Sequence, residues 1–151
     1  MDVEQVKSDY QAVRDLVRQE VFVRDINPIR CHEMAYLINA GMNQRNYDSL
    51  VEDGIYKSEF SDVFWHSWVM LKGSWGRLNG IILDFQFAKS SAMFYIVFRE
   101  PTWSDKVVTS WGEKRRYKRR KIHYDLADGI EELAEKLFSE QHNGAIGLSK
   151  K

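Results

Sequence analysis

The apolar positions near the start of the chain recur every three or four residues. Residues 3 to about 20 follow this spacing, with charged side chains between the apolar ones. Such spacing places the apolar side chains on one face of a helix, so we expect an amphipathic helix here. The Asn27-Pro28 step then interrupts the pattern, because the residue before a proline is biased away from helical geometry. The apolar members are Val3, Val6, Tyr10, Val13, Leu16 and Val17.

A second helix is predicted from about Ile29 to Ala40, where apolar residues return at helical spacing. Pro28 suits the first turn of a helix, and Gly41 suits the cap at its end. Cys31 then lies in the first or second turn. Residues 42–61 are polar and uneven, so we expect a loop with a short helical or strand piece around 47–51 and at 55–56. A connection of that length is often functional.

Runs of aromatic and β-branched residues predict three strands next, at about 63–71, 80–88 and 92–99. The links between these strands are short and contain Gly or Ser. Because parallel strands need long crossover connections, we expect neighbouring strands to be antiparallel. A turn at 101–105 and the pair Val107-Val108 follow. Residues 114–124 are predicted to form a further strand at a sheet edge, with basic side chains toward solvent. Asp128 is expected to cap a last helix at roughly 129–140.

This order of elements predicts an α+β fold in which the helices pack on an antiparallel β-sheet of about four strands. The length of 151 residues is that of one domain and is enough to bury a core. We expect a single domain at 1–142 and a flexible C-terminal tail at 143–151. No internal repeat is evident.

Composition narrows the functional classes. The 22 Lys and Arg residues equal the 22 Asp and Glu residues, so net charge indicates neither nucleic acid nor an anionic membrane as partner. A single cysteine forms no intramolecular disulfide and is typical of a reducing compartment. No apolar run reaches the roughly 18–20 residues of a membrane span, and the N-terminus lacks a signal-peptide pattern. We therefore expect a cytoplasmic protein with no membrane partner.

One histidine stands within the most apolar predicted strand. Alternation along that strand places Phe64, His66, Trp68 and Met70 on one side. A lone histidine among large apolar neighbours is commonly a hydrogen-bonded core residue. Two other features favour a catalytic interpretation: the single cysteine at the start of a helix, and a single aspartate among apolar residues of the next strand.

These three residue types together can activate a thiol. A thiolate is the reactive form of cysteine, and the positive end of a helix favours it, as an imidazolium does. Cys31 has that setting, His66 could exchange its proton, and Asp84 could orient the imidazole. A carboxylate in a strand as apolar as the one around Asp84 is costly without a partner. The alternative is that Cys31 is a small buried residue and Asp84 a satisfied structural carboxylate.

The three elements resemble a known family. Cys31-His32-Glu33-Met34-Ala35 at the start of a helix is similar to the opening of the transglutaminase-like core. His66-Ser67-Trp68-Val69 resembles its His-x-Trp-Val segment, and Leu83-Asp84-Phe85 resembles its final hydrophobic-Asp element. The order Cys, His, Asp is the same, and the resemblance covers residues 27–88. This superfamily belongs to the wider papain-like fold and includes cysteine proteases, glutamine deamidases, cross-linking acyltransferases, peptide N-glycanases and lasso-peptide leader peptidases.

The resemblance implies a triad of Cys31, His66 and Asp84 that forms a thioester with a protein or peptide substrate, without a cofactor or metal. Protease, deamidase and transglutaminase-like activities all stay open. Asn27 is the amide nearest the cysteine and the candidate oxyanion donor; the Gln or aromatic donor typical of the family is not evident. Phe85 stands where the family often has Pro. Trp65 and Trp68 are candidate walls of a substrate groove.

A basic run provides the main alternative. Seven of the eight residues at 114–121 are Lys or Arg, and Tyr117 is the exception. Such a strand could bind nucleic acid, with Tyr117 or Trp111 stacking on a base, or an acidic protein. The chain would then be a non-enzymatic binding module, of the kind found in viruses or mobile elements. A solvated strand protected by charge is the simpler interpretation. The basic residues are Lys114, Arg115, Arg116, Lys118, Arg119, Arg120 and Lys121.

Overall fold

The computed structural model describes residues 3–25, 30–58, 64–75, 78–84, 95–99, 106–109, 114–119 and 125–139. The expected tail at 143–151 lies outside these ranges. Among the described residues, no helix is both long enough and apolar enough to cross a membrane. The elements are, in order, α1 (Val3–Val23), α2 (Cys31–Gln44), β1 (Ser49–Ser58), β2 (Phe64–Trp75), β3 (Leu78–Asp84), β4 (Tyr95–Arg99), β5 (Lys106–Thr109), β6 (Lys114–Arg119), α3 (Ile130–Ala134) and the π-helix η2 (Glu135–Ser139). The predicted α+β class is confirmed.

The strands form a closed antiparallel barrel in the order β1-β2-β3-β4-β5-β6, with β1 pairing with both β2 and β6. The described residues thus contain six strands, where about four were predicted. The additional ones are β1, in the segment expected to be a loop, and β5, around Val107-Val108. The expected edge position of the basic strand is also wrong, because β6 pairs with β5 on one side and β1 on the other.

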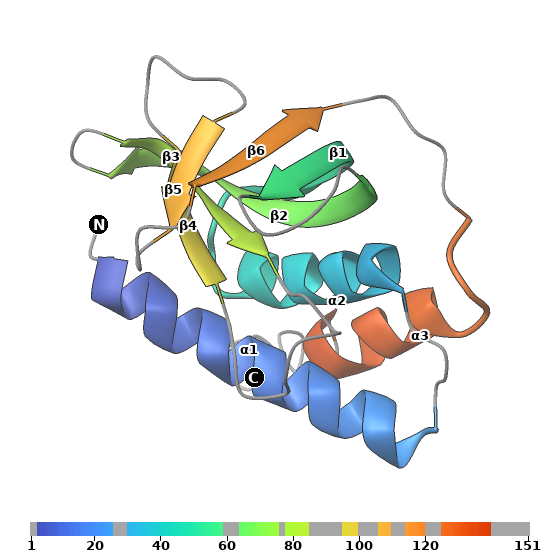
Figure 1. Ribbon diagram of the computed structural model, residues 1–151. Helices are drawn as coiled ribbons and strands as arrows, with labels where there is room; N and C mark the ends of the chain where they lie inside the picture. The colour runs from blue at the N-terminus through green and yellow to red at the C-terminus, as the bar shows by residue number, and fades with distance from the viewer. Residues whose placement is uncertain are drawn as a thin grey trace.

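Helix α2 lies between the barrel on one side and α1 and α3 on the other (Figure 1). The helical spacing predicted for α1 is confirmed, since Val6, Tyr10, Val13 and Val17 are all buried. Alternation along β2 divides the apolar side chains of that strand between two cores. Val69 and Leu71 pack with the helices, whereas Trp68 and Met70 pack with Tyr56, Ile82 and Tyr117 in a separate cluster inside the barrel.

The predicted end of α2 at Gly41 is wrong, because the helix continues to Gln44 and Arg45 is its C-terminal cap. Gly41 is needed for close packing instead. A Cβ added there would lie 2.5 Å from Val13 Cγ1 and 2.9 Å from Phe138 Cε1. The last helix also starts later than expected: α3 begins at Ile130, and Gly129, at φ 88°, takes the cap position expected for Asp128.

Candidate active site

Cys31 is the first residue of α2 and is half-buried. Arg30 and Glu33 hold the first turn of this helix together. Glu33 Oε1 accepts from the backbone N–H of Arg30 at 3.1 Å and from the side-chain Nε of Arg30 at 2.9 Å. Burial alone would raise the pKa of the Glu33 carboxyl, but the hydrogen bonds and charge of Arg30 lower it. Arg30 Nη2 also donates to the Asp125 carbonyl at 2.7 Å, which ties this helix end to the segment before α3.

His66 and Asp84 meet inside the barrel. His66 Nε2 lies 2.6 Å from Asp84 Oδ1, and the hydroxyl of Tyr117 donates to Asp84 Oδ2 at 2.6 Å. Only 3% of His66 and none of Asp84 is exposed. The ring centroids of Tyr56 and His66 lie 5.2 Å apart, with the two rings tilted by 58°. Because inward-facing positions alternate along each strand, β2, β3 and β6 each supply one member of this polar group.

Cys31 completes the arrangement, because the thiol and the His66 imidazole are close enough to shift the pKa of each other. Burial alone would raise the pKa of the thiol, but the hydrogen bond and charge of His66, together with the N–H of Ser67, lower it. Burial alone would lower the pKa of His66, but the charge and hydrogen bond of Asp84, and then Cys31, raise it. The pair is therefore biased toward thiolate and imidazolium. Since Asp84 holds Nε2, a proton exchanged with the thiol would pass through Nδ1.

The start of α2 also offers donors for an oxyanion. The first N–H groups of a helix have no intrahelical acceptors, and they point toward the end where Cys31 lies. A carbonyl oxygen that becomes negative at the sulfur would meet these groups and the positive end of the helix dipole. Asn27, the side-chain donor expected from the sequence, lies outside the described residues.

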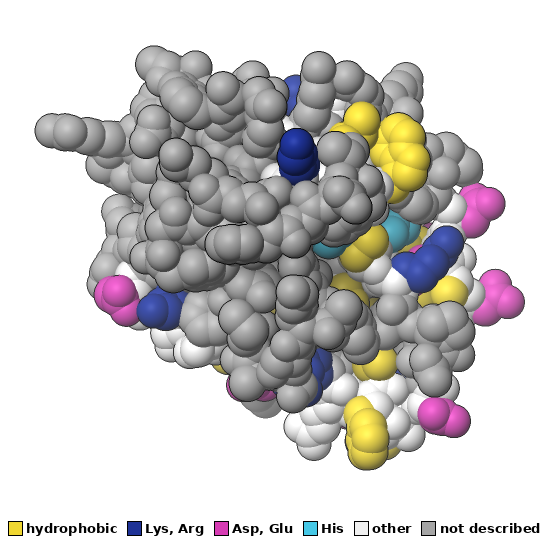
Figure 2. All heavy atoms as spheres, in the orientation of Figure 1, with side chains coloured by type: hydrophobic (Ala, Val, Ile, Leu, Met, Phe, Trp, Pro, Cys, Tyr) yellow, Lys and Arg dark blue, Asp and Glu magenta, His cyan; other side chains and the backbone are white. Residues whose placement is uncertain are grey.

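The two candidate groove tryptophans lie in different places. Trp65 is 60% exposed and precedes His66 in β2, so it can form a wall beside the site. Trp68 cannot, because it is 1% exposed inside the barrel and its Nε1 donates to Glu52 Oε1 at 2.8 Å. Its assignment to a substrate groove is wrong. Figure 2 shows histidine atoms of the described chain at the surface, close to hydrophobic atoms.

The basic run 114–121 is only partly described. Tyr117 is buried inside the barrel, so the expected stacking of its ring on a nucleic-acid base is wrong. Trp111, the other candidate for stacking, lies outside the described residues. Arg119 is exposed, and its Nη1 lies 3.5 Å from Glu52 Oε2. The side chains of Lys114, Arg115, Arg116, Lys118, Arg120 and Lys121 lie outside the described part.

Sequence reasoning missed the roles of three polar residues: Tyr117, which donates to Asp84, Asp53, which contacts His32 and Ser67, and Glu52, which accepts from the buried Trp68. The basic residues around Tyr117 favoured a strand that faces solvent. The single aromatic ring among them was nevertheless a signal that this position faces inward. Glu52 and Asp53 lay in a segment interpreted as a loop. Within the described residues, no three His, Cys, Asp or Glu side chains gather in a way that could hold a metal ion.

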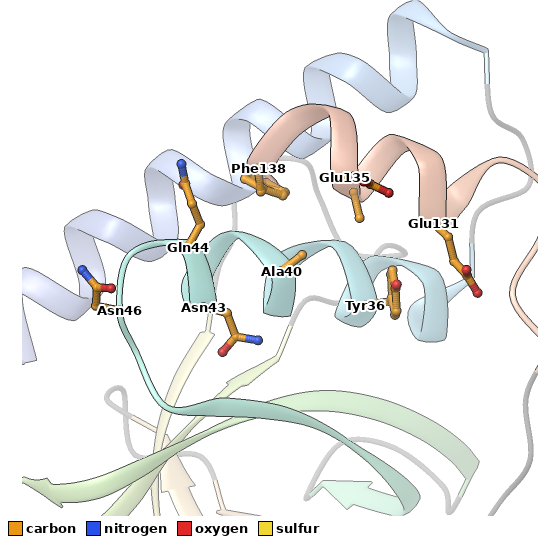
Figure 3. Close-up of a pocket in the computed structure, with 9 residues that line it drawn as sticks. Tyr36, Ala40, Asn43, Gln44, Asn46, Glu131, Glu135 and Phe138 are labelled. Carbon is orange, nitrogen blue, oxygen red and sulfur yellow. The ribbon is translucent and has the colours of Figure 1, made fainter. Parts of the chain in front are cut away.

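A groove of about 480 Å³ lies elsewhere, between α2 and the α3–η2 helix (Figure 3). Tyr36 and Ala40 line it from α2, and Glu131, Glu135 and Phe138 line it from the opposite helix. None of Cys31, His66 or Asp84 contributes to it. The groove is therefore separate from the candidate active site.

Replacing Tyr117 with phenylalanine is expected to destabilise the protein by about 1–3 kcal/mol, since a buried carboxylate loses a hydrogen-bond donor. Tyr47→Phe is a matched control, because the Tyr47 hydroxyl donates to Asp9 Oδ2, also at 2.6 Å, nearer the surface. The free energy of unfolding of both variants, measured in urea, compares the Tyr117–Asp84 hydrogen bond with the Tyr47–Asp9 hydrogen bond. We expect the larger loss for Tyr117→Phe because Asp84 is fully buried. Equal losses would contradict this.

Comparison with models of protein families, with curated proteins and with solved structures gave no match. The resemblance to the transglutaminase-like and papain-like group therefore stays a prediction from three short sequence elements.

Proposed function

We propose that this chain is a cysteine-dependent hydrolase or acyl transferase that acts on amide or peptide bonds, with a transglutaminase-like, papain-like core. One observation carries the proposal: a buried imidazole is held by Asp84 at 2.6 Å and lies close enough to a cysteine at a helix start for each to shift the pKa of the other. A cysteine with only a packing role would not require an imidazole beside its thiol, or a carboxylate to orient that imidazole. The lowered pKa of the thiol and the raised pKa of His66 support the same function.

In the first half of the proposed reaction, the Cys31 thiolate attacks the carbonyl carbon of the substrate. A carbon–sulfur bond forms, and the carbonyl electron pair moves to oxygen, where the N–H groups at the start of α2 stabilise it. The tetrahedral intermediate then collapses, and the carbon–nitrogen bond breaks. The His66 imidazolium gives its proton to the leaving nitrogen, so ammonia or an amine departs and a thioester remains on Cys31.

In the second half, neutral His66 takes a proton from the incoming nucleophile, which attacks the thioester carbonyl. Release of Cys31 as a thiolate restores the starting pair. Water as nucleophile gives proteolysis or deamidation, and an amine gives transamidation. Asp84 orients the ring and stabilises the imidazolium throughout, as the third member of such triads does.

The proposed substrate is a protein or peptide, with exposed Trp65 forming one wall of its binding site. A reducing compartment such as the cytoplasm would keep Cys31 as a free thiol. A binding module that uses residues 114–121 has less support, since Tyr117 faces the barrel interior and Arg119 is ion-paired with Glu52.

The proposal is tested with a pool of glutamine-containing peptides and an added primary amine, incubated with wild type or Cys31→Ala and analysed by mass spectrometry. We expect products from wild type alone, together with an acyl group trapped on Cys31 after rapid acid quenching. Shortened peptides would indicate proteolysis, conversion of Gln to Glu deamidation, and amine incorporation transamidation. Product formation by Cys31→Ala at the wild-type rate would exclude the thioester mechanism.

A further inference from the structure

A second polar cluster lies next to the first and has no role in the steps above. His32 Nδ1 lies 3.1 Å from Asp53 Oδ1 and 3.3 Å from Ser67 Oγ, and the Ser67 hydroxyl donates to Asp53. Asp53 and Ser67 are register partners on β1 and β2. The His32 and Asp53 side chains are only 13% and 20% exposed, so the cluster is largely shielded from water.

The cluster contains Ser, His and Asp, but its geometry does not make Ser67 a nucleophile. In a serine hydrolase, the imidazole stands between the hydroxyl and the carboxylate and uses a different ring nitrogen for each. Here the serine and the aspartate contact the same nitrogen, and the hydroxyl donates directly to the carboxylate. Because a carboxylate only accepts, Nδ1 of His32 donates to Asp53. The carboxylate therefore receives two donors and holds them together.

The positions of these residues along the chain connect the cluster to the candidate active site. His32 follows Cys31 on α2, and Ser67 follows His66 on β2. The backbone N–H of Ser67 also lies near enough to Cys31 to lower the pKa of its thiol. The cluster thus joins the start of α2 to β2 at the one place where the sulfur must meet the imidazole.

We propose that His32, Asp53 and Ser67 are positioning residues, which set the separation of Cys31 and His66 by fixing the start of α2 on strands β1 and β2. This inference rests on the proposed function. Arg30 also fixes this helix end, since its side chain pairs with Glu33 in the first turn and donates to the Asp125 carbonyl in the segment before α3. A small displacement of one reacting group relative to another is enough to lose about a hundredfold in rate, so such fixing has a measurable effect.

The test uses the rate of Cys31 alkylation by iodoacetamide as a function of pH, in wild type and in three His32 variants. In His32→Asn the side-chain amide nitrogen can occupy the place of Nδ1 and donate to Asp53. In His32→Gln the amide reaches further, toward the place of Nε2, and His32→Ala has no donor. We expect about a tenfold loss of rate at pH 6 in His32→Ala and His32→Gln, and a rate within about threefold of wild type in His32→Asn.

His66→Ala is measured in the same assay, because it separates the positioning role of the cluster from the proposed function of Cys31 and His66. If His66→Ala slows alkylation at pH 6 while all three His32 variants match wild type, the positioning role is wrong and the proposed function stands. If His66→Ala also matches wild type, the proposed function itself fails. Thermal unfolding of each variant completes the test: His32 variants that lose stability but keep the wild-type pH profile would show a purely structural cluster, which also overturns the inference.

Discussion

Replacing His66 with alanine is expected to slow alkylation of Cys31 at pH 6 by about 10- to 100-fold. A thiol with the ordinary pKa of about 8.5 is only about 0.3% ionised at pH 6. In the wild type, the imidazolium lowers the pKa of Cys31, so far more of the thiol is ionised. A thiolate of lower pKa is also a weaker nucleophile, by about threefold per unit of thiol pKa, which reduces the advantage but does not remove it.

The sign of this effect is expected to change with pH. The wild-type rate falls as pH drops through the lowered pKa of Cys31, and the influence of the imidazolium ends as pH rises through the raised pKa of His66. At about pH 10 both thiols are ionised, and the variant thiolate, being more basic, reacts as fast or faster. Since the chain has one cysteine, wild type denatured in urea gives the reference rate of an ordinary thiol. A native rate at pH 6 equal to that reference would contradict the prediction.

Hydrophobic periodicity was sufficient to predict the helices, because the apolar spacing of α1 reflects a single buried face. The same reasoning failed at β1, because the charged residues Glu52 and Asp53 interrupt the apolar pattern and favoured the prediction of a loop. These carboxylates have partners that only the folded chain brings near: Trp68 and Arg119 for Glu52, and His32 and Ser67 for Asp53. Closure of the barrel was likewise not predictable, since pairing between β1 and β6 joins segments about 60 residues apart.

The candidate site was predicted in outline but not in its surroundings. A cysteine at a helix start, a histidine in an apolar strand and an isolated aspartate in the next strand are each locally unusual, so sequence alone could single them out. The structure joins the histidine to the aspartate by a hydrogen bond, and the cysteine lies close enough to the histidine to raise its pKa. Which neighbours face inward depends on register, and register placed Trp68 in the interior and Trp65 outside. The same register brought Tyr117, which belongs to a strongly basic strand, onto Asp84.

The largest effect on stability is expected at Asp84. Asp84→Ala removes the carboxylate from a buried imidazole and from the Tyr117 hydroxyl, and breaking such a pair from one side costs about 3–5 kcal/mol. Without Asp84, the largest influence that raises the pKa of His66 is lost and burial lowers it, so the ring shifts toward the neutral form and Cys31 toward a thiol. We therefore expect both a loss of stability in urea unfolding and slower alkylation at pH 6.

Asp84→Asn separates these two consequences, because the amide keeps the size of the side chain and an oxygen that can accept from Tyr117, but carries no charge. We expect a smaller loss of stability, about 1–3 kcal/mol, with alkylation slowed as strongly as in Asp84→Ala. Leu83→Ala is the matched control on the same strand, since Leu83 packs with the helices and its loss costs about 2–5 kcal/mol without changing the charge near His66. An Asp84→Asn variant that alkylates at the wild-type rate at pH 6 would show that the carboxylate charge does not hold the imidazolium. A Leu83→Ala variant as slow as Asp84→Asn would instead attribute the effect to loosened packing.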